Sequence, residues 1–318
     1  MQDKDNKKAD VQASEKLGVT ITGLKLANPT MLAAGVLGSS GASLVRVAKA
    51  GTGAVITKSI GIEPKEGHHN PSMVELECGY INAMGLPNPG YSNFAKELQV
   101  AKNGCGALIP SVPVIASIFG ASPEEFVTIA EGLKVADAFE LNVSCPHASG
   151  FGASVGTDPV LVGEIVRAMK KHIHVPVWVK LTPNVTDIVE VGLAAQKSGA
   201  DAVCAINTVR AMAIDIETGY PILGNRFGGM SGPAIKPVAI KCVYDLYQYL
   251  DIPIIGVGGI STWRDAVEMM MAGASAVQIG SAAADIEVFS RVPSGIGNFI
   301  EKKNMRISEI VGLAHRMG

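Results

Sequence analysis

Short runs of apolar residues recur along this chain, and glycine, proline or polar residues bound each of them. Runs rich in Val, Ile and Ala are typical of parallel strands that are buried on both faces. The pattern predicts strands at Thr30–Ala34, Ala54–Lys58, Val114–Ile118, Ala138–Asn142, Val177–Lys180, Ala202–Asn207, Ile254–Gly258 and Ala276–Gly280. Eight such strands are the number found in a (β/α)8 TIM barrel.

Segments of helical length separate the predicted strands, so each connection can form a right-handed crossover. We expect helices at Asp158–His172, Asp187–Ser198, Pro237–Leu250 and Thr262–Ala272, among others. Residues 198–203 and 272–277 share one motif, in which a glycine ends a helix and the chain re-enters the sheet. A doubly wound sheet explains fewer of these turns, so we predict an α/β fold of the barrel type.

Three segments depart from an even barrel. Val19–Leu26 alternates apolar and polar residues and predicts an N-terminal β-hairpin. Long insertions follow the second and sixth predicted strands, at residues 61–113 and 209–233. Because both insertions follow the carboxyl ends of strands, we expect them to fold over the mouth of the barrel.

Composition and charge exclude several classes of protein. The chain has 318 residues, 47% of them hydrophobic, and no linker divides it, so we expect one domain over residues 17–318. A net charge of −2 gives no basic field for nucleic acid or an anionic membrane. Residues 1–16 lack an apolar core and are expected to be a disordered leader, not a signal peptide. No run approaches the roughly 18 apolar residues of a membrane span, so we expect a cytoplasmic protein.

The cysteines predict no metal site. Five are scattered along the chain without a C-x-x-C pair, which argues against a zinc ribbon, an iron–sulfur cluster or a disulfide framework. Cys145 differs from the rest because it follows a predicted strand in which Phe139 and Leu141 are candidate core residues. After Pro146 comes the glycine-rich segment 148–156, a loop that can close over a ligand. A thiol therefore leaves a strand at the end where barrel enzymes carry their chemistry.

Polar residues stand at the carboxyl ends of four predicted strands: Lys58, Asn142, Lys180 and the pair Asn207-Thr208. A lysine that ends an apolar strand is costly unless its charge has a partner. For one lysine alone, extension of the ammonium to solvent explains the pattern equally well. Two lysines and two asparagines at one rim favour a planar, polar, partly anionic ligand.

Glycine clusters at 228–232, 256–259 and 280 surround the last two predicted strands. Barrels bind phosphate there through backbone N–H groups, so we predict a phosphate-bearing ligand. The glycine patterns of NAD and ATP sites are absent. A further segment, Tyr80–Gly90, contains Gly85 and two prolines. It fits either a rigid loop that presents backbone N–H groups or an ordinary turn.

Together these residues resemble the class 1 dihydroorotate dehydrogenases, flavin enzymes of pyrimidine biosynthesis with a (β/α)8 barrel. The resemblance extends from about Gly18 to near the end of the chain. The motifs that carry it are Thr57-Lys58-Ser59, Asn82-Ala83-Met84-Gly85-Leu86, Asn142-Val143-Ser144-Cys145-Pro146, Lys180-Leu181-Thr182-Pro183-Asn184, Asn207-Thr208 and Gly258-Gly259. It implies oxidation of (S)-dihydroorotate to orotate in de novo UMP synthesis.

The resemblance also implies roles for single residues. Cys145 takes the proton from C5 as the catalytic base, where class 2 enzymes carry serine, and the hydride from C6 goes to FMN. The residues implied for the substrate are Lys58, Asn82, Ala83, Met84, Gly85, Leu86, Asn142, Asn207 and Thr208. Those implied for the FMN ring are Ala34, Lys58, Ser59, Ser117, Asn142, Lys180 and Ile206. Those implied for its phosphate are Gly232, Gly258, Gly259, Gly280 and Ser281.

Two positions depart from the family pattern, because His147 and Ser117 stand where asparagine is usual. A histidine at that place is also found in dihydropyrimidine dehydrogenases, so an enzyme that acts on uracil or thymine is an alternative. Against it stands the loop 82–86, whose backbone donors suit a carboxylate that uracil lacks. A non-catalytic barrel that binds a phosphorylated metabolite is a second alternative, which a colourless preparation without FMN would favour.

The electron acceptor is indicated by residues 182–188 and 231–237, which look like the class 1B branch. In that branch a second subunit with FAD and a 2Fe–2S cluster passes electrons to NAD. The resemblance therefore implies such a partner around a homodimer of this chain. Met84 and Pro87-Asn88 also occur in the fumarate-using branch, so fumarate is the alternative acceptor.

Overall fold

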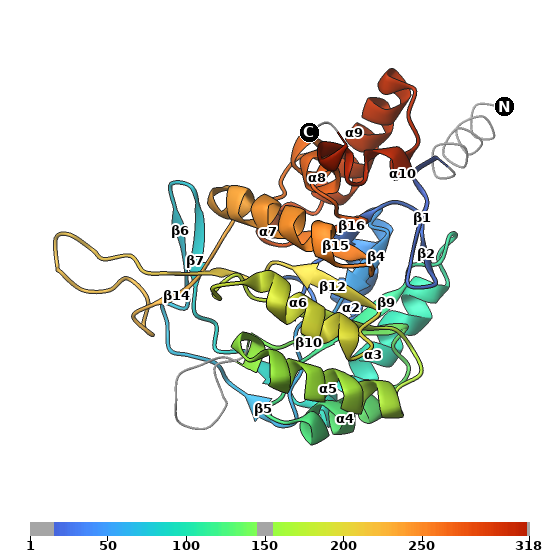
Figure 1. The fold of residues 1–318 in the computed structure, drawn as a ribbon. Coiled ribbons are helices and arrows are strands. Elements are labelled where there is room, and N and C mark those ends of the chain that lie inside the picture. The colour runs from blue at the N-terminus through green and yellow to red at the C-terminus, as the bar shows by residue number, and fades with distance from the viewer. Residues whose placement is uncertain (1–15, 145–154, 317–318) are drawn as a thin grey trace.

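The computed structural model describes residues 16–144 and 155–316 (Figure 1). Eight parallel strands close into a barrel in the order β3-β4-β9-β10-β11-β12-β15-β16, which confirms the predicted fold. Their bounds are β3 Thr30–Leu32, β4 Ala54–Ile56, β9 Val114–Ile118, β10 Ala138–Asn142, β11 Val177–Leu181, β12 Ala202–Ala205, β15 Ile254–Val257 and β16 Ala276–Ile279. Each lies within one residue or two of its predicted run.

Helices cover the outside of the barrel (Figure 1). They are α2 Gly41–Lys49, α3 Tyr91–Gly106, α4 Pro123–Gly132, α5 Pro159–His172, α6 Ile188–Lys197, α7 Lys236–Tyr249, α8 Trp263–Met271, α9 Val288–Lys303 and α10 Ile307–Ile310. Short polar side chains fix where they begin: Asp158 caps α5 ahead of Pro159, and Thr262 forms a capping box with Asp265 at α8. Among the described residues, no helix has the length and apolarity needed to span a membrane.

The core has two parts because side chains alternate along each strand. Phe139 and Leu141, both predicted as core residues, are buried between the strands and the helices. Ala138 and Trp178 point inward and pack on apolar residues of the other strands. The predicted N-terminal hairpin, β1 Val19–Ile21 and β2 Leu24–Leu26, closes this inner part from below. There the Trp178 Nε1 donates to Thr22 Oγ1 at 3.0 Å.

One local arrangement occurs twice at the amino ends of the strands. Asp137 accepts the Val114 N–H that opens β9, and its other oxygen pairs with Lys102. Asp201 likewise accepts the Val177 N–H that opens β11 and pairs with Lys170 at 2.7 Å. Each aspartate thus ties the start of one strand to a helix that precedes it.

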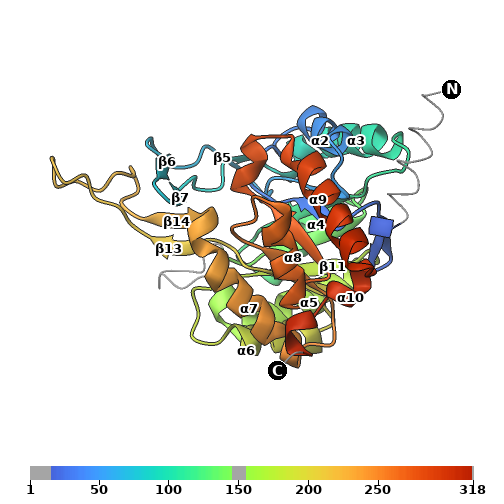
Figure 2. The same ribbon diagram turned by 90° about the horizontal axis from the view of Figure 1, so that it is seen from above.

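The two insertions meet in one sheet. The first contributes β6 Met73–Leu76 and β7 Gly79–Asn82, and the second contributes β13 Val209–Ala211 and β14 Gly228–Ser231. The four strands pair in the order β13-β14-β7-β6 and extend from one side of the barrel in both views (Figures 1 and 2). A smaller pair, β5 Pro64–Lys65 and β8 Asn88–Pro89, lies within the first insertion.

Candidate active site

A chain of hydrogen bonds joins predicted site residues across the carboxyl ends of four strands. Ser117 Oγ and Ser59 Oγ are 2.9 Å apart, and Asn142 Nδ2 donates to Ser59 Oγ at 3.0 Å. Asn207 Nδ2 donates to Asn142 Oδ1 at 3.1 Å. Because each amide is held at both its donor and its acceptor end, the two asparagines have fixed orientations.

Strand register places Lys180 in the same group. Lys180 is the partner of Asn142 in the β10–β11 ladder, and both side chains point inward. Lys180 is 5% exposed, and its Nζ donates to Gln278 Oε1 at 3.0 Å. The Glu140 carboxylate, 0% exposed, lies below it with an Nζ–Oε1 distance of 3.6 Å. Glu140 is therefore the charged partner that a lysine at the end of an apolar strand requires, and it lies inside the barrel.

A second cation lies on the neighbouring part of the mouth. Lys58 follows β4, and its backbone N–H donates to Gly38 O at 2.9 Å, which takes it out of the strand ladder. Burial lowers the pKa of the Lys58 ammonium, because a charge that has lost water is disfavoured. An anion bound beside Lys58 would restore a favourable environment for this charge.

The sheet of the two insertions brings Asn82 and Thr208 to the site. Gly229 pairs with Asn82, whose Nδ2 donates to Gly229 O at 3.3 Å. The Thr208 side chain packs against Gly229, where a Cβ atom would overlap its hydroxyl. Asn184, which was given no role from the sequence, holds Thr208 from the other side by donating to its carbonyl at 3.0 Å.

The predicted loop after Asn82 is stabilised on both sides. Gly85 and Leu86 have positive φ angles of 72° and 55°. His68 contacts the loop through its N–H to Met84 O at 3.1 Å, and Asn88 Nδ2 donates to Leu86 O at 2.9 Å. These bonds favour the rigid loop over the ordinary turn. The role of its backbone donors in binding a substrate stays a prediction.

The glycine clusters form a backbone cradle at the ends of β15 and β16. Gly258 and Gly259 have φ angles of 127° and 72°, and a Cβ atom on Gly259 would lie 2.5 Å from Lys236 Cβ. In the part of the chain that the structure describes, the N–H groups of Gly259 and Ser281 are bonded to no protein acceptor. Unpaired donors beside glycines suit the oxygens of a phosphate.

Residues predicted for the ring and for the phosphate are neighbours. Ile206 is 1% exposed, and its N–H donates to Val257 O at the base of the cradle. Gly280 lies beside Ala33, the residue before Ala34. Gly232, with a φ of 90°, follows β14 against Gly79. Some residues predicted for the ring and for the phosphate therefore lie next to one another at the carboxyl ends of β12, β15 and β16.

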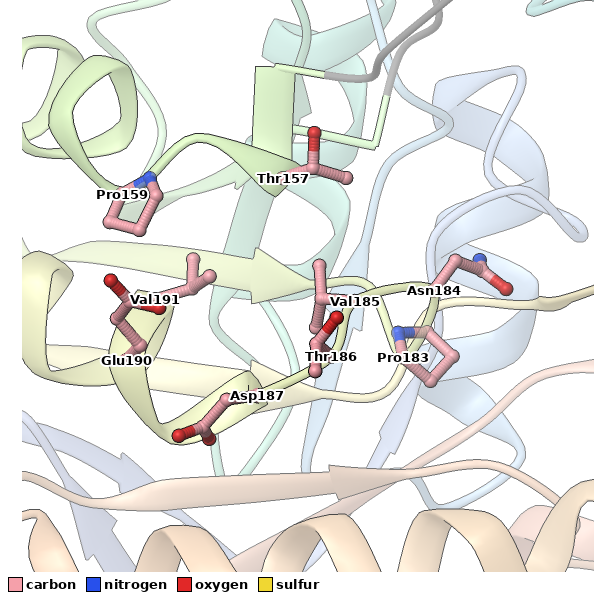
Figure 3. A pocket seen from close by; sticks show the side chains of 9 residues that line it. All are labelled: Thr157, Pro159, Pro183, Asn184, Val185, Thr186, Asp187, Glu190 and Val191. Atoms are coloured by element: carbon pink, nitrogen blue, oxygen red, sulfur yellow. The ribbon is translucent and has the colours of Figure 1, made fainter.

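A separate hollow of about 560 Å³ lies beside the mouth, between the start of α5 and the β11–α6 loop. Figure 3 shows the carboxylates of Asp187 and Glu190 on its α6 side, opposite Thr157 and Pro159. None of the predicted site residues that the structure describes lines it. Among the described lining residues are two carboxylates and no cation, which does not favour an anionic ligand.

The predicted base, Cys145, lies outside the described residues, as do His147 and most of the loop 148–156. The described chain reaches Ser144, whose N–H donates to Asn142 Oδ1 at 3.3 Å. It resumes with Val155, and the Gly156 N–H donates to Val143 O at 2.7 Å. Both ends of the segment that holds Cys145 are thus fixed at the carboxyl end of β10.

Sequence reasoning missed Glu140 and Gln278. Both are polar residues at inward positions of otherwise apolar strands, and that alternation was the signal that could have found them. Within the described residues, no group of His, Cys, Asp and Glu side chains is arranged to hold a metal ion.

Comparison with known proteins gives a consistent result. A family model described as dihydroorotate dehydrogenase matches residues 16–300. A protein of Methanocella arvoryzae is 65% identical over 303 residues, which cover 95% of this chain and 99% of that protein. A protein of Methanosarcina acetivorans is 62% identical, covering 93% and 96%, and one of Pyrococcus abyssi is 52% identical, covering 94% and 99%. All three are named dihydroorotate dehydrogenase B (NAD(+)), catalytic subunit.

Proposed function

We propose a reaction for this chain from one premise, which is that the chain belongs to the dihydroorotate dehydrogenase family. It is a flavin-dependent oxidoreductase of pyrimidine biosynthesis that converts dihydroorotate to orotate. The single observation that carries the assignment to this site is the joined group Ser59, Asn142 and Asn207 beside two lysines. That group offers fixed amides and positive charge to a small anionic heterocycle.

We infer that the flavin is FMN. The unpaired N–H groups of Gly259 and Ser281 suit its phosphate, and a nucleotide with one phosphate needs one such cradle. The ring would lie against Ala34, Lys58, Ser59, Ser117, Asn142, Lys180 and Ile206. The phosphate would bind Gly232, Gly258, Gly259, Gly280 and Ser281. Bound there, FMN supplies a hydride acceptor.

The protein residues then have distinct tasks. Lys58 binds the substrate carboxylate, which offsets the cost of its own burial. Asn142 and Asn207 orient the pyrimidine through the second N–H of each amide, which these bonds leave unused, together with Asn82, Thr208 and the loop 83–86. The Cys145 thiolate accepts the proton from C5 while the hydride leaves C6, so that a C5–C6 double bond forms. Lys180 stabilises the negative charge that the hydride brings.

We further infer a homodimer, from the resemblance to the class 1B branch, and a second subunit, which carries FAD and a 2Fe–2S cluster and passes electrons to NAD. The second subunit is supported by the name of the relatives, which includes both NAD(+) and catalytic subunit. The five scattered cysteines of this chain also lack the spacing that holds such a cluster.

The deciding experiment is anaerobic reduction of the purified chain. We expect a yellow protein whose visible absorbance bleaches when dihydroorotate is added, and does not bleach with dihydrouracil or dihydrothymine. Bleaching by the latter compounds would favour the dihydropyrimidine dehydrogenase alternative. A preparation that stays colourless after incubation with FMN would refute a flavin enzyme. Orotate formation with NAD, in the presence and absence of the co-purified partner, tests the acceptor.

A further inference from the structure

Inside the barrel, directly below the proposed flavin site, lies a buried polar group of three residues, of which the proposed reaction uses only Lys180. Gln278 on β16 connects Glu140 on β10 to Lys180 on β11. Its Oε1 accepts from Lys180 Nζ at 3.0 Å, and its Nε2 donates to Glu140 Oε2 at 2.6 Å. All three side chains are almost completely buried.

The geometry of this group is not that of a simple ion pair. Lys180 Nζ stands 3.6 Å from Glu140 Oε1, beyond hydrogen-bond distance, and within the described residues that oxygen has no hydrogen-bond partner. A buried carboxylate with an unpaired oxygen attracts a nearby ammonium strongly. The Gln278 amide bonds to both partners of this ion pair, whose own N–O distance is longer than a hydrogen bond.

Cys204 completes this layer without adding charge. Gln278 Nε2 lies 3.5 Å from Cys204 Sγ. Burial, and then the Glu140 carboxylate, raise the pKa of the Cys204 thiol well above its ordinary value, so the thiol stays neutral. Cys204 therefore adds no third charge to the Glu140–Lys180 ion pair.

We propose that Glu140 and Gln278 are positioning residues that set the height and the effective charge of Lys180 below the flavin. Gln278 is a spacer: it prevents Lys180 from collapsing onto Glu140, so that the ammonium stays available to the reduced ring. Glu140 limits how strongly that ammonium favours the reduced ring. The inference rests on the proposed function, since it assumes a flavin at this mouth.

The two residues predict shifts of opposite sign in the midpoint potential of bound FMN. Gln278→Met lets Lys180 drop onto Glu140, so the potential becomes more negative. Glu140→Gln leaves the ammonium uncompensated, so the potential becomes more positive. We expect each change to alter the ratio of reduced to oxidised FMN affinity about tenfold, which is about 30 mV for a two-electron couple. A purely structural role would not give opposite signs.

Two further variants separate the cause. In a Lys180→Met background, Gln278→Met should leave the potential unchanged, because its effect passes through the lysine. Cys204→Ala perturbs the same layer without a charge and should also leave it unchanged. If Glu140→Gln does not fold, Gln278→Met with its Lys180→Met control still decides. If Gln278→Met and Glu140→Gln leave the midpoint potential unchanged, or shift it in the same direction, the proposal is overturned. If the wild-type protein takes up no FMN, the proposed function is overturned as well.

Discussion

Replacing Gly229 by alanine tests how the outer sheet shapes the substrate site. The three atoms nearest to an added Cβ all belong to Thr208, with Cβ at 2.6 Å and Cγ2 at 3.3 Å. Contacts this short force the threonine side chain to rotate or its backbone to shift. The backbone of Thr208 resists the second movement, because its N–H is bound to Asn207 Oδ1 at 2.8 Å and its carbonyl to Asn184.

The magnitude follows from the bond that Thr208 would give up. A hydrogen bond to a charged ligand contributes about 1.5–3 kcal/mol. Since about 1.4 kcal/mol corresponds to a tenfold change, the Kd of orotate should rise roughly tenfold to a hundredfold. FMN content should not change, because the three atoms nearest to the new methyl group belong to Thr208, which is not among the residues proposed for FMN.

Orotate binding can be measured by titration of the flavin spectrum. Gly106→Ala is the matched control, because a Cβ there meets no atom within 4 Å and alanine favours the end of α3. It should leave the Kd unchanged and slightly raise the melting temperature. An unchanged Kd in Gly229→Ala, with Thr208→Ala also without effect, would refute a substrate role for this threonine.

Three other predictions concern the base, a buried cation and the barrel's lower end. Cys145→Ala should retain FMN but slow its reduction by dihydroorotate about 10²–10⁴-fold in stopped-flow traces; near-normal reduction would contradict its role as the base. Burial lowers the pKa of Lys58 in the folded protein below its value in the unfolded chain. At a pH between these two values the folded protein binds fewer protons than the unfolded chain, so the free energy of unfolding rises with pH there. Lys58→Met should therefore raise the free energy of unfolding at neutral pH and weaken orotate binding. In urea titrations at several pH values it should also flatten the rise of stability with pH; a steeper rise would contradict the direction of the pKa shift. Asp201→Asn keeps an acceptor for the Val177 N–H but loses the charge that pairs with Lys170, so it should lower the free energy of unfolding in urea by about 0.5–1 kcal/mol. The control Asp245→Asn, which breaks an exposed pair with Lys241, should have no measurable effect.

The barrel itself could be predicted because its signal is local. β9 and β10 have the predicted bounds, since a run buried on both faces has few ways to begin or end. β4 ends at Ile56 instead of Lys58, because the lysine N–H bonds to Gly38 and leaves the ladder. Whether this N–H bonds to the neighbouring strand or to Gly38 depends on tertiary contacts, which the local sequence does not show.

That predicted residues gather at one rim could be foreseen from the sequence, but the network that joins them could not. That Asn142, Lys180 and Asn207 lie near one another follows from parallel strands ending at one rim. The connection of Glu140 to Gln278 joins strands that are far apart in the chain and appears only when the barrel closes. Periodicity gives the face of each residue, but it does not give its partner on another strand.

The pairing of β7 with β14 has a consequence for how substrate recognition can change. Asn82 comes from one insertion and Thr208 from the strand connection that begins the other, and the two meet through Gly229. In a chimera that takes only one of the two insertions from a relative, β7 and β14 would come from different proteins. Their edges would then pair poorly beside the proposed substrate site. We therefore expect a change of specificity in this architecture to require exchange of both segments together.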